Sequence, residues 1–335
     1  MKTNLKGRDF ISIMDFKQEE LETIFELAFD LKRRVAVGEP HPLLAGKTLG
    51  MLFASPSTRT RISFETGMTQ LGGHAQYYSP DQLQLKNKES WRDTAEMVSR
   101  FIEGFMIRLY NLKTQMGTDT YEYGDARNVL RAIAEYATIP IINALDDKEH
   151  PCQIMADIMT MKEKFGDSYK SKKIVMGWAY DERAKSAGVP QTMAAAAGIL
   201  GMNIVLAYPD IEGYDIDPEY FNFAKKAAQE SGGSVTVEHD IWKACQGADI
   251  IYCKSWARNP ELHEKNRDKF KQDWCISHKH FENASKRAKY MHCLPAKRGQ
   301  EVTDALIDDP VLSIVNDEAE NRLHVQKAIM ALTMR

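Results

Sequence analysis

Residues 55–65 combine small hydroxyl side chains with two arginines, in the order Ser-Pro-Ser-Thr-Arg-Thr-Arg-Ile-Ser-Phe-Glu. An apolar run typical of a buried strand, residues 48–54, precedes this stretch, and a helical pattern follows it. This order directs backbone N–H groups and a helix N-terminus toward an anion. A simple helix cap needs one hydroxyl side chain, whereas phosphate also suits the planar fork of an arginine. The sequence therefore predicts a phosphate site made by Ser57, Thr58, Arg59 and Thr60.

The composition narrows the class of protein. A length of 335 residues suggests two domains, and a net charge of −3 gives no sign of a surface for nucleic acid or another polyanion. No apolar run reaches the roughly 18 residues of a membrane span, and the polar first residues do not resemble a signal peptide. Five cysteines without CxxC spacing argue against a disulfide framework. We expect a cytoplasmic protein that binds small molecules and neither nucleic acid nor a membrane.

Strand and helix patterns alternate along both halves of the chain, which predicts two α/β domains with doubly wound parallel sheets. We expect the first domain at residues 1–147 and the second at 148–315, with a C-terminal helix (316–335) that packs back on the first. The expected strands are 48–54, 75–79, 105–109, 139–143, 173–178, 203–207, 235–238, 250–253 and 288–294. The expected helices are 16–37, 64–71, 90–101, 126–136, 154–164, 189–198, 218–231, 241–245 and 316–334.

Further polar groups follow other expected strands, where open α/β sheets bind ligands. An arginine closing a strand is often a solvated strand end, and a histidine one turn before a glutamine is often a helix cap. A cysteine after a strand is a core residue or a nucleophile, although no histidine base stands at a recognisable spacing from it. The groups are Arg108, the pair His150 and Gln153, the run His292-Cys293-Leu294-Pro295, and Glu320-Asn321-Arg322 at the start of the last helix.

Together, these five groups resemble the transcarbamylase family, in its order and roughly at its spacing, over essentially the whole chain. The resemblance implies that the first domain binds carbamoyl phosphate and the second an amino acceptor, with the active site in the cleft between them. It also implies a homotrimer in which a loop of the neighbouring subunit completes each site. Here that loop corresponds to residues 79–89, with Lys86 and Lys88 as the candidate residues.

The family's chemistry needs no metal, no cofactor and no covalent enzyme intermediate, because carbamoyl phosphate carries a good leaving group. The enzyme must neutralise the phosphate, polarise the carbonyl and align a neutral amine. The resemblance implies that Thr60, Arg108 and His150 act on the carbonyl oxygen. It also implies that Gln153, the carbonyl group of Leu294 beside Cys293, and Arg322 hold the carbamoyl amide.

The acceptor is predicted from two departures from ornithine-using members. Those members carry Ser-Met-Gly after an aspartate, where this chain has Cys-Lys-Ser-Trp-Ala at 253–257. A lysine there suits a carboxylate or an acylated amine. The same Lys-Ser-Trp occurs in the N-acetylornithine, N-succinylornithine and YgeW-type enzymes, and the long loop 178–191 resembles the loop that forms their trefoil knot. The candidate acceptor-binding residues are Lys254, Ser255, Trp256, Lys297 and Arg298.

We therefore predict a carbamoyltransferase of the knotted branch whose acceptor is not free ornithine. Ornithine itself, giving citrulline, stays open, because residues 89–94 and 293–299 look like those of ornithine enzymes. A catalytically silent homologue that only binds carbamoyl phosphate is a second alternative. An NAD-dependent oxidoreductase is a third, but no G-x-G-x-x-G follows a strand.

Overall fold

The computed structural model describes residues 3–84 and 89–334, which divide into two compact units. Unit 1 consists of Met1–Ala156 and Glu320–Arg335, and unit 2 of Asp157–Ala319. The divisions fall inside two helices, α6 (Pro151–Phe165) and α12 (Val315–Thr333). The chain therefore returns to its first unit only in its last 16 residues.

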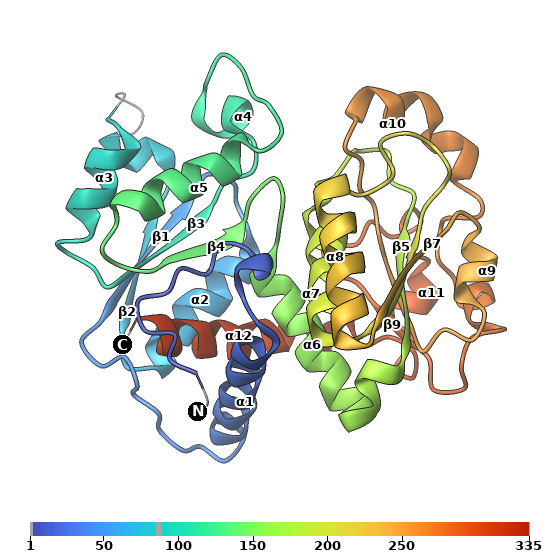
Figure 1. The fold of residues 1–335 in the computed structure, drawn as a ribbon, viewed down its shortest axis with the longest axis horizontal. Helices are drawn as coiled ribbons and strands as arrows, with labels where there is room; N and C mark the ends of the chain where they lie inside the picture. Colours follow the sequence, from blue (N-terminus) through green and yellow to red (C-terminus); the bar gives the residue numbers. More distant parts are fainter. Residues whose placement is uncertain (1–2, 85–88, 335) are drawn as a thin grey trace. The chain divides into compact units, whose positions relative to one another are not determined.

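Unit 1 is built on a four-stranded sheet in the order β2-β1-β3-β4, and every pairing in it is parallel (Figure 1). All residues of β4 and most of those of β1 and β3 are buried, as expected for a parallel sheet covered on both faces. Because the strands are parallel, their carboxyl ends lie at one edge of the sheet. The strands are β1 (Thr48–Phe53), β2 (His74–Tyr78), β3 (Gly104–Arg108) and β4 (Ile141–Leu145).

The helices of unit 1 cover both faces of this sheet (Figure 1). Helices α3 and α5 join a core cluster with Leu52, Phe105 and Ile107 of the strands. Helix α2 meets the end of α12 at Gly67, where a β-carbon would lie 3.1 Å from Met330 Cε, so a small residue allows the close approach. The helices are α1 (Gln18–Ala36), α2 (Thr58–Gln70), α3 (Trp91–Val98), α4 (Leu112–Met116) and α5 (Asp125–Tyr136).

Unit 2 has a five-stranded sheet in the order β7-β6-β5-β8-β9, again parallel throughout (Figure 1). The strands are β5 (Lys173–Trp178), β6 (Asn203–Ala207), β7 (Ser234–Glu238), β8 (Ile250–Lys254) and β9 (Lys289–Met291). The helices are α7 (Gly188–Leu200), α8 (Pro218–Ser231), α9 (Ile241–Cys245), α10 (Pro260–Asn266) and α11 (Asp304–Ile307). Helices α7 and α8 pack closely at Gly198, where a β-carbon would lie 2.6 Å from the carbonyl oxygen of Ala224.

The expected strands all exist, with differences at their ends. The strand expected at 288–294 ends at Met291, because His292 leaves the sheet to donate its N–H to Glu318 and Leu294 has a φ of +52°. The helix expected at 64–71 begins six residues earlier, at Thr58, because Ser57 caps it. Helices α4, α10 and α11 were not predicted, since each is shorter than the two turns that reveal a period. The described residues also form short 3₁₀ turns: η1 (Ile13–Asp15), η2 (Pro80–Gln82), η4 (Gly166–Ser171), η5 (Arg267–Phe270) and η6 (His278–Phe281).

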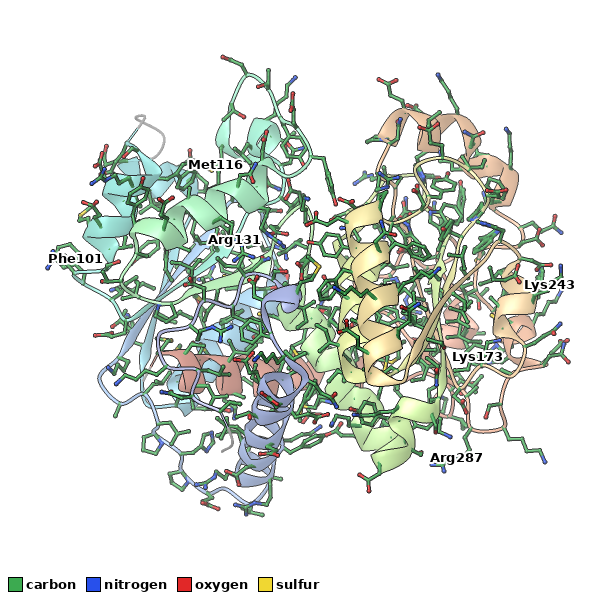
Figure 2. All side chains as sticks on the ribbon, in the orientation of Figure 1. Phe101, Met116, Arg131, Lys173, Lys243 and Arg287 are labelled. Carbon is green, nitrogen blue, oxygen red and sulfur yellow. The ribbon has the colours of Figure 1, made fainter. Side chains whose placement is uncertain are left out.

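The surface of unit 1 exposes several large apolar side chains. Phe101, which follows α3 (Figure 2), is 73% exposed, and Ile62 on α2 is 57% exposed. Such side chains suit contact with another protein surface when they gather in one patch. Within the described part of the chain, no helix is long and apolar enough to cross a membrane.

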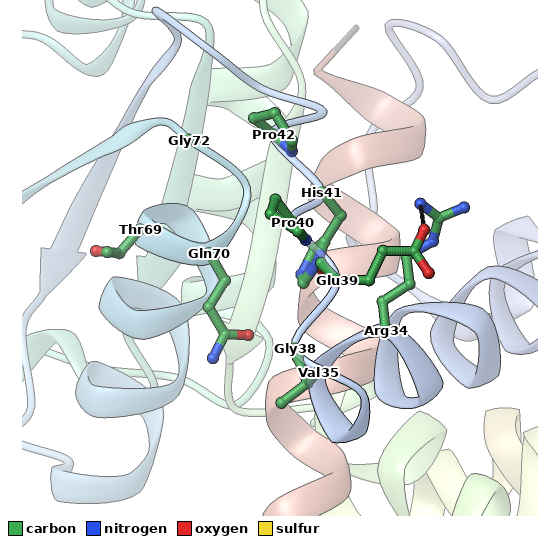
Figure 3. Close-up of a pocket in the computed structure, with 10 residues that line it drawn as sticks. All are labelled: Arg34, Val35, Gly38, Glu39, Pro40, His41, Pro42, Thr69, Gln70 and Gly72. Atoms are coloured by element: carbon green, nitrogen blue, oxygen red, sulfur yellow. Dashed lines mark hydrogen bonds and ion pairs between the residues drawn. The ribbon is translucent and has the colours of Figure 1, made fainter.

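A pocket of about 370 Å³ lies at the ends of α1 and α2 in unit 1, and His41 and Gln70 are among the residues that line it (Figure 3). The buried Lys327 contacts both of these residues. The ammonium group of Lys327 donates to Gln70 Oε1 at 2.7 Å and lies 3.2 Å from His41 Nε2. His41 Nδ1 lies 2.9 Å from the carbonyl oxygen of Glu39, which can only accept a hydrogen bond, so Nε2 is the acceptor for Lys327. Burial lowers the pKa of Lys327 to about 8.

This pKa predicts how stability depends on pH. Between about pH 8 and 10.5 the unfolded chain binds a proton on Lys327 that the folded chain has lost, so raising the pH through this window favours folding. The free energy of unfolding, relative to that of Lys327→Met, should rise by at most about 1.4 kcal/mol per pH unit there and stay constant below about pH 7. Urea unfolding of both proteins from pH 6 to 10 measures this. If the free energies of unfolding of the wild type and Lys327→Met differ by the same amount at every pH, Lys327 is not a buried lysine with a lowered pKa.

Candidate active site

The residues of the predicted phosphate site, here called the cradle, lie where the turn after β1 enters α2. Ser57 is the N-cap of α2, and its Oγ accepts the N–H of Thr60 at 3.4 Å. Thr58 and Arg59 occupy the first two positions of the helix, where N–H groups have no partner within a helix. The cradle therefore presents backbone N–H groups, two hydroxyls and a guanidinium at one helix N-terminus.

The Thr60 hydroxyl joins this cradle to the last helix. Its oxygen accepts hydrogen bonds from Ser57 Oγ at 2.9 Å and from Arg322 Nη2 at 2.6 Å. A hydroxyl has two acceptor positions and one donor. With both acceptor positions used, Thr60 has its own hydrogen to donate, which suits the carbonyl-polarising role predicted for it. Thr60 and Arg322 are both buried, although 262 positions separate them in the chain.

Arg108 lies at the end of β3, directly beside the cradle. It pairs with Phe53 in the register of β1 and β3, and its carbonyl accepts the N–H of Ala54 at 3.0 Å. Its guanidinium lies 5.9 Å from the ring centre of Tyr110, whose hydroxyl is 2.9 Å from Ser55 Oγ. The side chain that ends β3 thus belongs to the same sheet edge as the turn that follows β1.

His150 and Gln153 follow the next strand of the sheet, β4, at the start of α6. The carbonyl of His150 accepts the N–H of Gln153 at 3.1 Å, so the two residues flank the first turn of the helix. Both side chains are buried. Strands β1, β3 and β4 are neighbours, so the groups predicted from three separate sequence motifs come to one edge of unit 1.

A buried charged cluster that sequence reasoning missed shapes the turn before His150. Asp147 accepts the N–H groups of Gly124 at 2.7 Å and Ala126 at 3.1 Å, while Arg127 makes an ion pair with Asp146 and another with Glu149 at 3.1 Å. Burial raises the pKa of Asp146 to about 6, although Arg127 opposes this. The acidic run at 146–149, directly after a buried strand, is the signal that could have revealed the cluster.

In unit 2, the run after β9 is held by its own histidine. The N–H of Leu294 donates to His292 Nδ1 at 2.9 Å, and the peptide bond between Leu294 and Pro295 is cis. Burial raises the pKa of the Cys293 thiol to about 11, so it carries a proton at neutral pH. A protonated thiol is a poor nucleophile, which agrees with the prediction that Cys293 does not attack the substrate.

The acceptor candidates after β8 are deeply buried. The ammonium group of Lys254, a residue 6% exposed, donates to the carbonyls of Ser186 at 2.9 Å and Ser255 at 2.8 Å. Trp256 is buried, and its indole N–H donates to the carbonyl of Tyr214 at 2.8 Å. Lys254 therefore ties the loop after β8 to the loop that precedes α7.

The side chains of the remaining candidates, Lys297 and Arg298, pair with carboxylates. Lys297 Nζ forms an ion pair with Glu182 at 2.9 Å, and Arg298 pairs with Asp304 at 3.0 Å and Asp308 at 2.7 Å, all at exposed positions. The structure therefore shows no direct contact that brings Arg298 to Lys254 among the described residues. Lys86 and Lys88, the candidates for completing a neighbouring site, lie outside the residues that the structure describes.

Comparison with known proteins identifies the class. A family model described as "Aspartate/ornithine carbamoyltransferase, carbamoyl-P binding domain" matches residues 8–163, and one described as "Aspartate/ornithine carbamoyltransferase, Asp/Orn binding domain" matches residues 172–333. The protein is thus an enzyme that transfers carbamoyl groups. The chain belongs to the aspartate/ornithine carbamoyltransferase family, which confirms the predicted resemblance at this level.

Individual relatives match over nearly their whole length. The ornithine carbamoyltransferase of Thermococcus kodakarensis is 41% identical over 335 residues, covering 100% of this chain and 98% of that protein. That of Symbiobacterium thermophilum is 43% identical over 333 residues, 99% of each chain. The solved structure of ornithine carbamoyltransferase from Pyrococcus furiosus is 40% identical, with a TM-score of 0.86 over 99% of this chain and 98% of that one. The predicted fold class, two parallel-sheet α/β domains, is confirmed.

The comparisons bear differently on the finer predictions. A structure of acetylornithine transcarbamylase complexed with acetylcitrulline also has a TM-score of 0.86, at 31% identity over 97% of this chain and 98% of that one. The more similar relatives are nevertheless named ornithine carbamoyltransferases. The prediction that free ornithine is not the acceptor is therefore not supported, and assignment to the knotted branch stays a prediction.

The protonated state of Cys293 leads to a test. Cys293→Ala should keep kcat within about tenfold of the wild type, because roughly one thiol in ten thousand is ionised at neutral pH. Release of phosphate from carbamoyl phosphate in the presence of an amine acceptor measures kcat. Mass spectrometry of the enzyme quenched during turnover is the control. A carbamoylated peptide containing Cys293 that disappears in the variant would overturn the interpretation.

Proposed function

We propose that this enzyme transfers the carbamoyl group of carbamoyl phosphate to the side-chain amine of ornithine, giving citrulline and phosphate. The observation that carries the carbamoyl phosphate half is the cradle at the N-terminus of α2, with Thr60 bridging Ser57 and Arg322. The acceptor half is supported by relatives named ornithine carbamoyltransferase that match the whole chain at about 40% identity.

Unit 1 would hold carbamoyl phosphate. The N–H groups of the first turn of α2, the hydroxyls of Ser57 and Thr58, and the guanidinium of Arg59 bind the phosphate. Thr60, Arg108 and His150 donate to the carbonyl oxygen, where negative charge grows as the amine attacks. Gln153 and Arg322 hold the carbamoyl amide, and the family resemblance assigns the Leu294 carbonyl to the same amide.

The reaction then needs only positioning and fixed charge. The neutral amine forms a bond to the carbamoyl carbon, and the bond from that carbon to the phosphate oxygen breaks. The departing phosphate accepts the proton that the amine loses. Arginines that bind the phosphate stabilise its charge as it leaves, so the chemistry uses no ionised cysteine and no enzyme-bound intermediate.

The contacts of three basic side chains in unit 2 remove the sequence argument for an acceptor with an anionic tail. Such a tail needs a cation that is available to it. The ammonium of Lys254 is already bound by two backbone carbonyls, and Lys297 and Arg298 are bound by exposed carboxylates. N-Acetylornithine is the second candidate, favoured by the Lys-Ser-Trp sequence and by the likeness to acetylornithine transcarbamylase.

Two further features of the family resemblance form part of the proposal. The trefoil knot is supported by contacts of the loop 179–191 with the segment after β8: the N–H of Ala257 donates to the carbonyl of Lys185 at 3.0 Å, and Lys254 donates to that of Ser186. The homotrimer is supported by exposed apolar side chains of unit 1, among them Ile62 and Phe101. In that assembly, Lys86 or Lys88 would complete the site of the neighbouring subunit.

Arg59→Ala tests the phosphate cradle. A charge-assisted hydrogen bond to phosphate contributes roughly 1.5–3 kcal/mol, so the affinity for carbamoyl phosphate should fall at least about tenfold. Isothermal titration calorimetry measures it. The control is Arg131→Ala in the same unit, where an exposed guanidinium pairs with Asp15 at 2.7 Å, and its affinity should match the wild type (Figure 2). An affinity of Arg59→Ala for carbamoyl phosphate equal to that of Arg131→Ala and the wild type would refute the cradle.

A panel of amines tests the acceptor. Wild-type enzyme with carbamoyl phosphate should give its highest kcat/KM with ornithine, at least about tenfold above N-acetylornithine, N-succinylornithine and aspartate, as followed by ureido product. The tenfold margin corresponds to about 1.4 kcal/mol of preference between transition states. A higher kcat/KM with an acylated amine would refute ornithine while leaving carbamoyl transfer intact. No ureido product with any amine, despite tight binding of carbamoyl phosphate, would favour the silent homologue.

A further inference from the structure

One buried carboxylate joins three loops of unit 2. Glu301 Oε1 accepts the N–H of Ser255 at 2.7 Å, and Oε2 accepts Lys185 Nζ at 2.5 Å and the N–H of Lys297 at 2.8 Å. Glu301 is fully buried. These donors come from the loops that follow β5, β8 and β9, which are neighbouring strands of one parallel sheet. A single side chain therefore sets the spacing of the loops at this edge.

The same carboxylate also faces the histidine that holds Leu294. His292 Nε2 lies 3.4 Å from Glu301 Oε1, while His292 Nδ1 accepts the N–H of Leu294 at 2.9 Å. Since Nδ1 accepts, a neutral imidazole carries its hydrogen on Nε2, on the side of Glu301. Burial lowers the pKa of His292, which favours the neutral ring. The Glu301 carboxylate thus favours the tautomer of His292 whose Nδ1 accepts the N–H of Leu294. That hydrogen bond helps to hold Leu294 in its left-handed conformation, with a φ of +52°.

Charge keeps Glu301 ionised in this setting. Burial raises the pKa of Glu301, but the interactions with His292 and Lys185 outweigh it and hold that pKa well below its ordinary value. Lys185 also forms an ion pair with Asp181 at 2.8 Å. Burial lowers the pKa of Lys185, but the carboxylates of Glu301 and Asp181 outweigh this effect and raise that pKa. The network therefore keeps its charges throughout the neutral range.

We infer that Glu301 is a positioning residue for carbamoyl transfer, which acts through His292 on the Leu294 carbonyl and through Ser255 on the loop after β8. This inference rests on the proposed function, in which the Leu294 carbonyl holds the carbamoyl amide. Because Glu301 is fully buried, it acts through the groups that it holds, the N–H groups of Ser255 and Lys297 and the ring of His292.

The test separates positioning from folding and from phosphate binding. Glu301→Gln keeps the shape of the side chain but places an amide nitrogen against one of the donors that the carboxylate accepts. We expect kcat to fall at least about tenfold, whereas calorimetry should give an affinity for inorganic phosphate within about twofold of the wild type. Glu301→Asp keeps the charge and should recover part of kcat. Glu264→Gln, an exposed glutamate on α10, is the matched control and should behave as the wild type.

Loss of the carboxylate leaves Lys185 with fewer acceptors, so Glu301→Gln could fail to fold. The triple variant Asp181→Asn/Lys185→Met/Glu301→Gln removes all three charges of the cluster and nearly keeps its volume. A folded triple variant with the same low kcat and normal phosphate affinity would support positioning. Wild-type kcat in either folded variant would overturn it, as would a kcat of Glu301→Asp no higher than that of Glu301→Gln.

The same assays also distinguish failure of this inference from failure of the proposed function. The assays use whichever amine gives the highest kcat/KM with wild-type enzyme, so a different acceptor leaves the comparison valid. Absence of turnover in wild-type enzyme would refute the proposed function itself. Normal turnover in wild-type enzyme and in the folded Glu301→Gln variant would refute only the role of Glu301.

Discussion

The arrangement of the chemistry depends on the parallel direction of both sheets. Parallel strands end at a common edge, so a short motif after each strand meets the motifs after its neighbours without long loops. In unit 1, the neighbouring strands β1, β3 and β4 lead into the phosphate cradle, Arg108 and His150. In unit 2, the neighbouring strands β5, β8 and β9 lead into three loops that contact Glu301. The candidate groups of each unit are therefore gathered by topology before any side chain makes a specific contact.

Specific contacts then fix these loops, and each unit uses a buried charged cluster for the purpose. Arg127 with Asp146 and Glu149 shapes the turn before His150, and Lys185 with Asp181 and Glu301 holds the loops of unit 2. Buried ion pairs contribute little net stability, because desolvating the charges costs about as much as their attraction returns. Their directional hydrogen bonds to backbone N–H groups still favour one loop conformation over others. We therefore attribute both clusters to geometry rather than to stability.

The sequence predicted the fold class and the strands because both follow from local patterns, and strands β5 and β6 have the predicted bounds. Its phosphate site stays a prediction, although Ser57 does cap α2 from within the motif. It missed what depends on distant partners. The charged cluster at Asp146 needs Arg127 from helix α5, and the fate of the Lys254 ammonium depends on a carbonyl 68 positions away. The acidic run at 146–149 signals a cluster, but no local pattern identifies these distant partners.

Lys254 shows why a residue type alone is weak evidence for a substrate. As a sequence feature, a lysine at a strand end suggests an anionic or acylated acceptor. In the structure, the same ammonium donates to the carbonyls of Ser186 and Ser255 and is nearly excluded from solvent. Burial lowers the pKa of Lys254, as expected for a cation removed from water. A cation engaged in this way holds two loops together, so its presence is compatible with ornithine as well as with an acylated relative, and the choice of acceptor depends on the space and polarity that those loops leave.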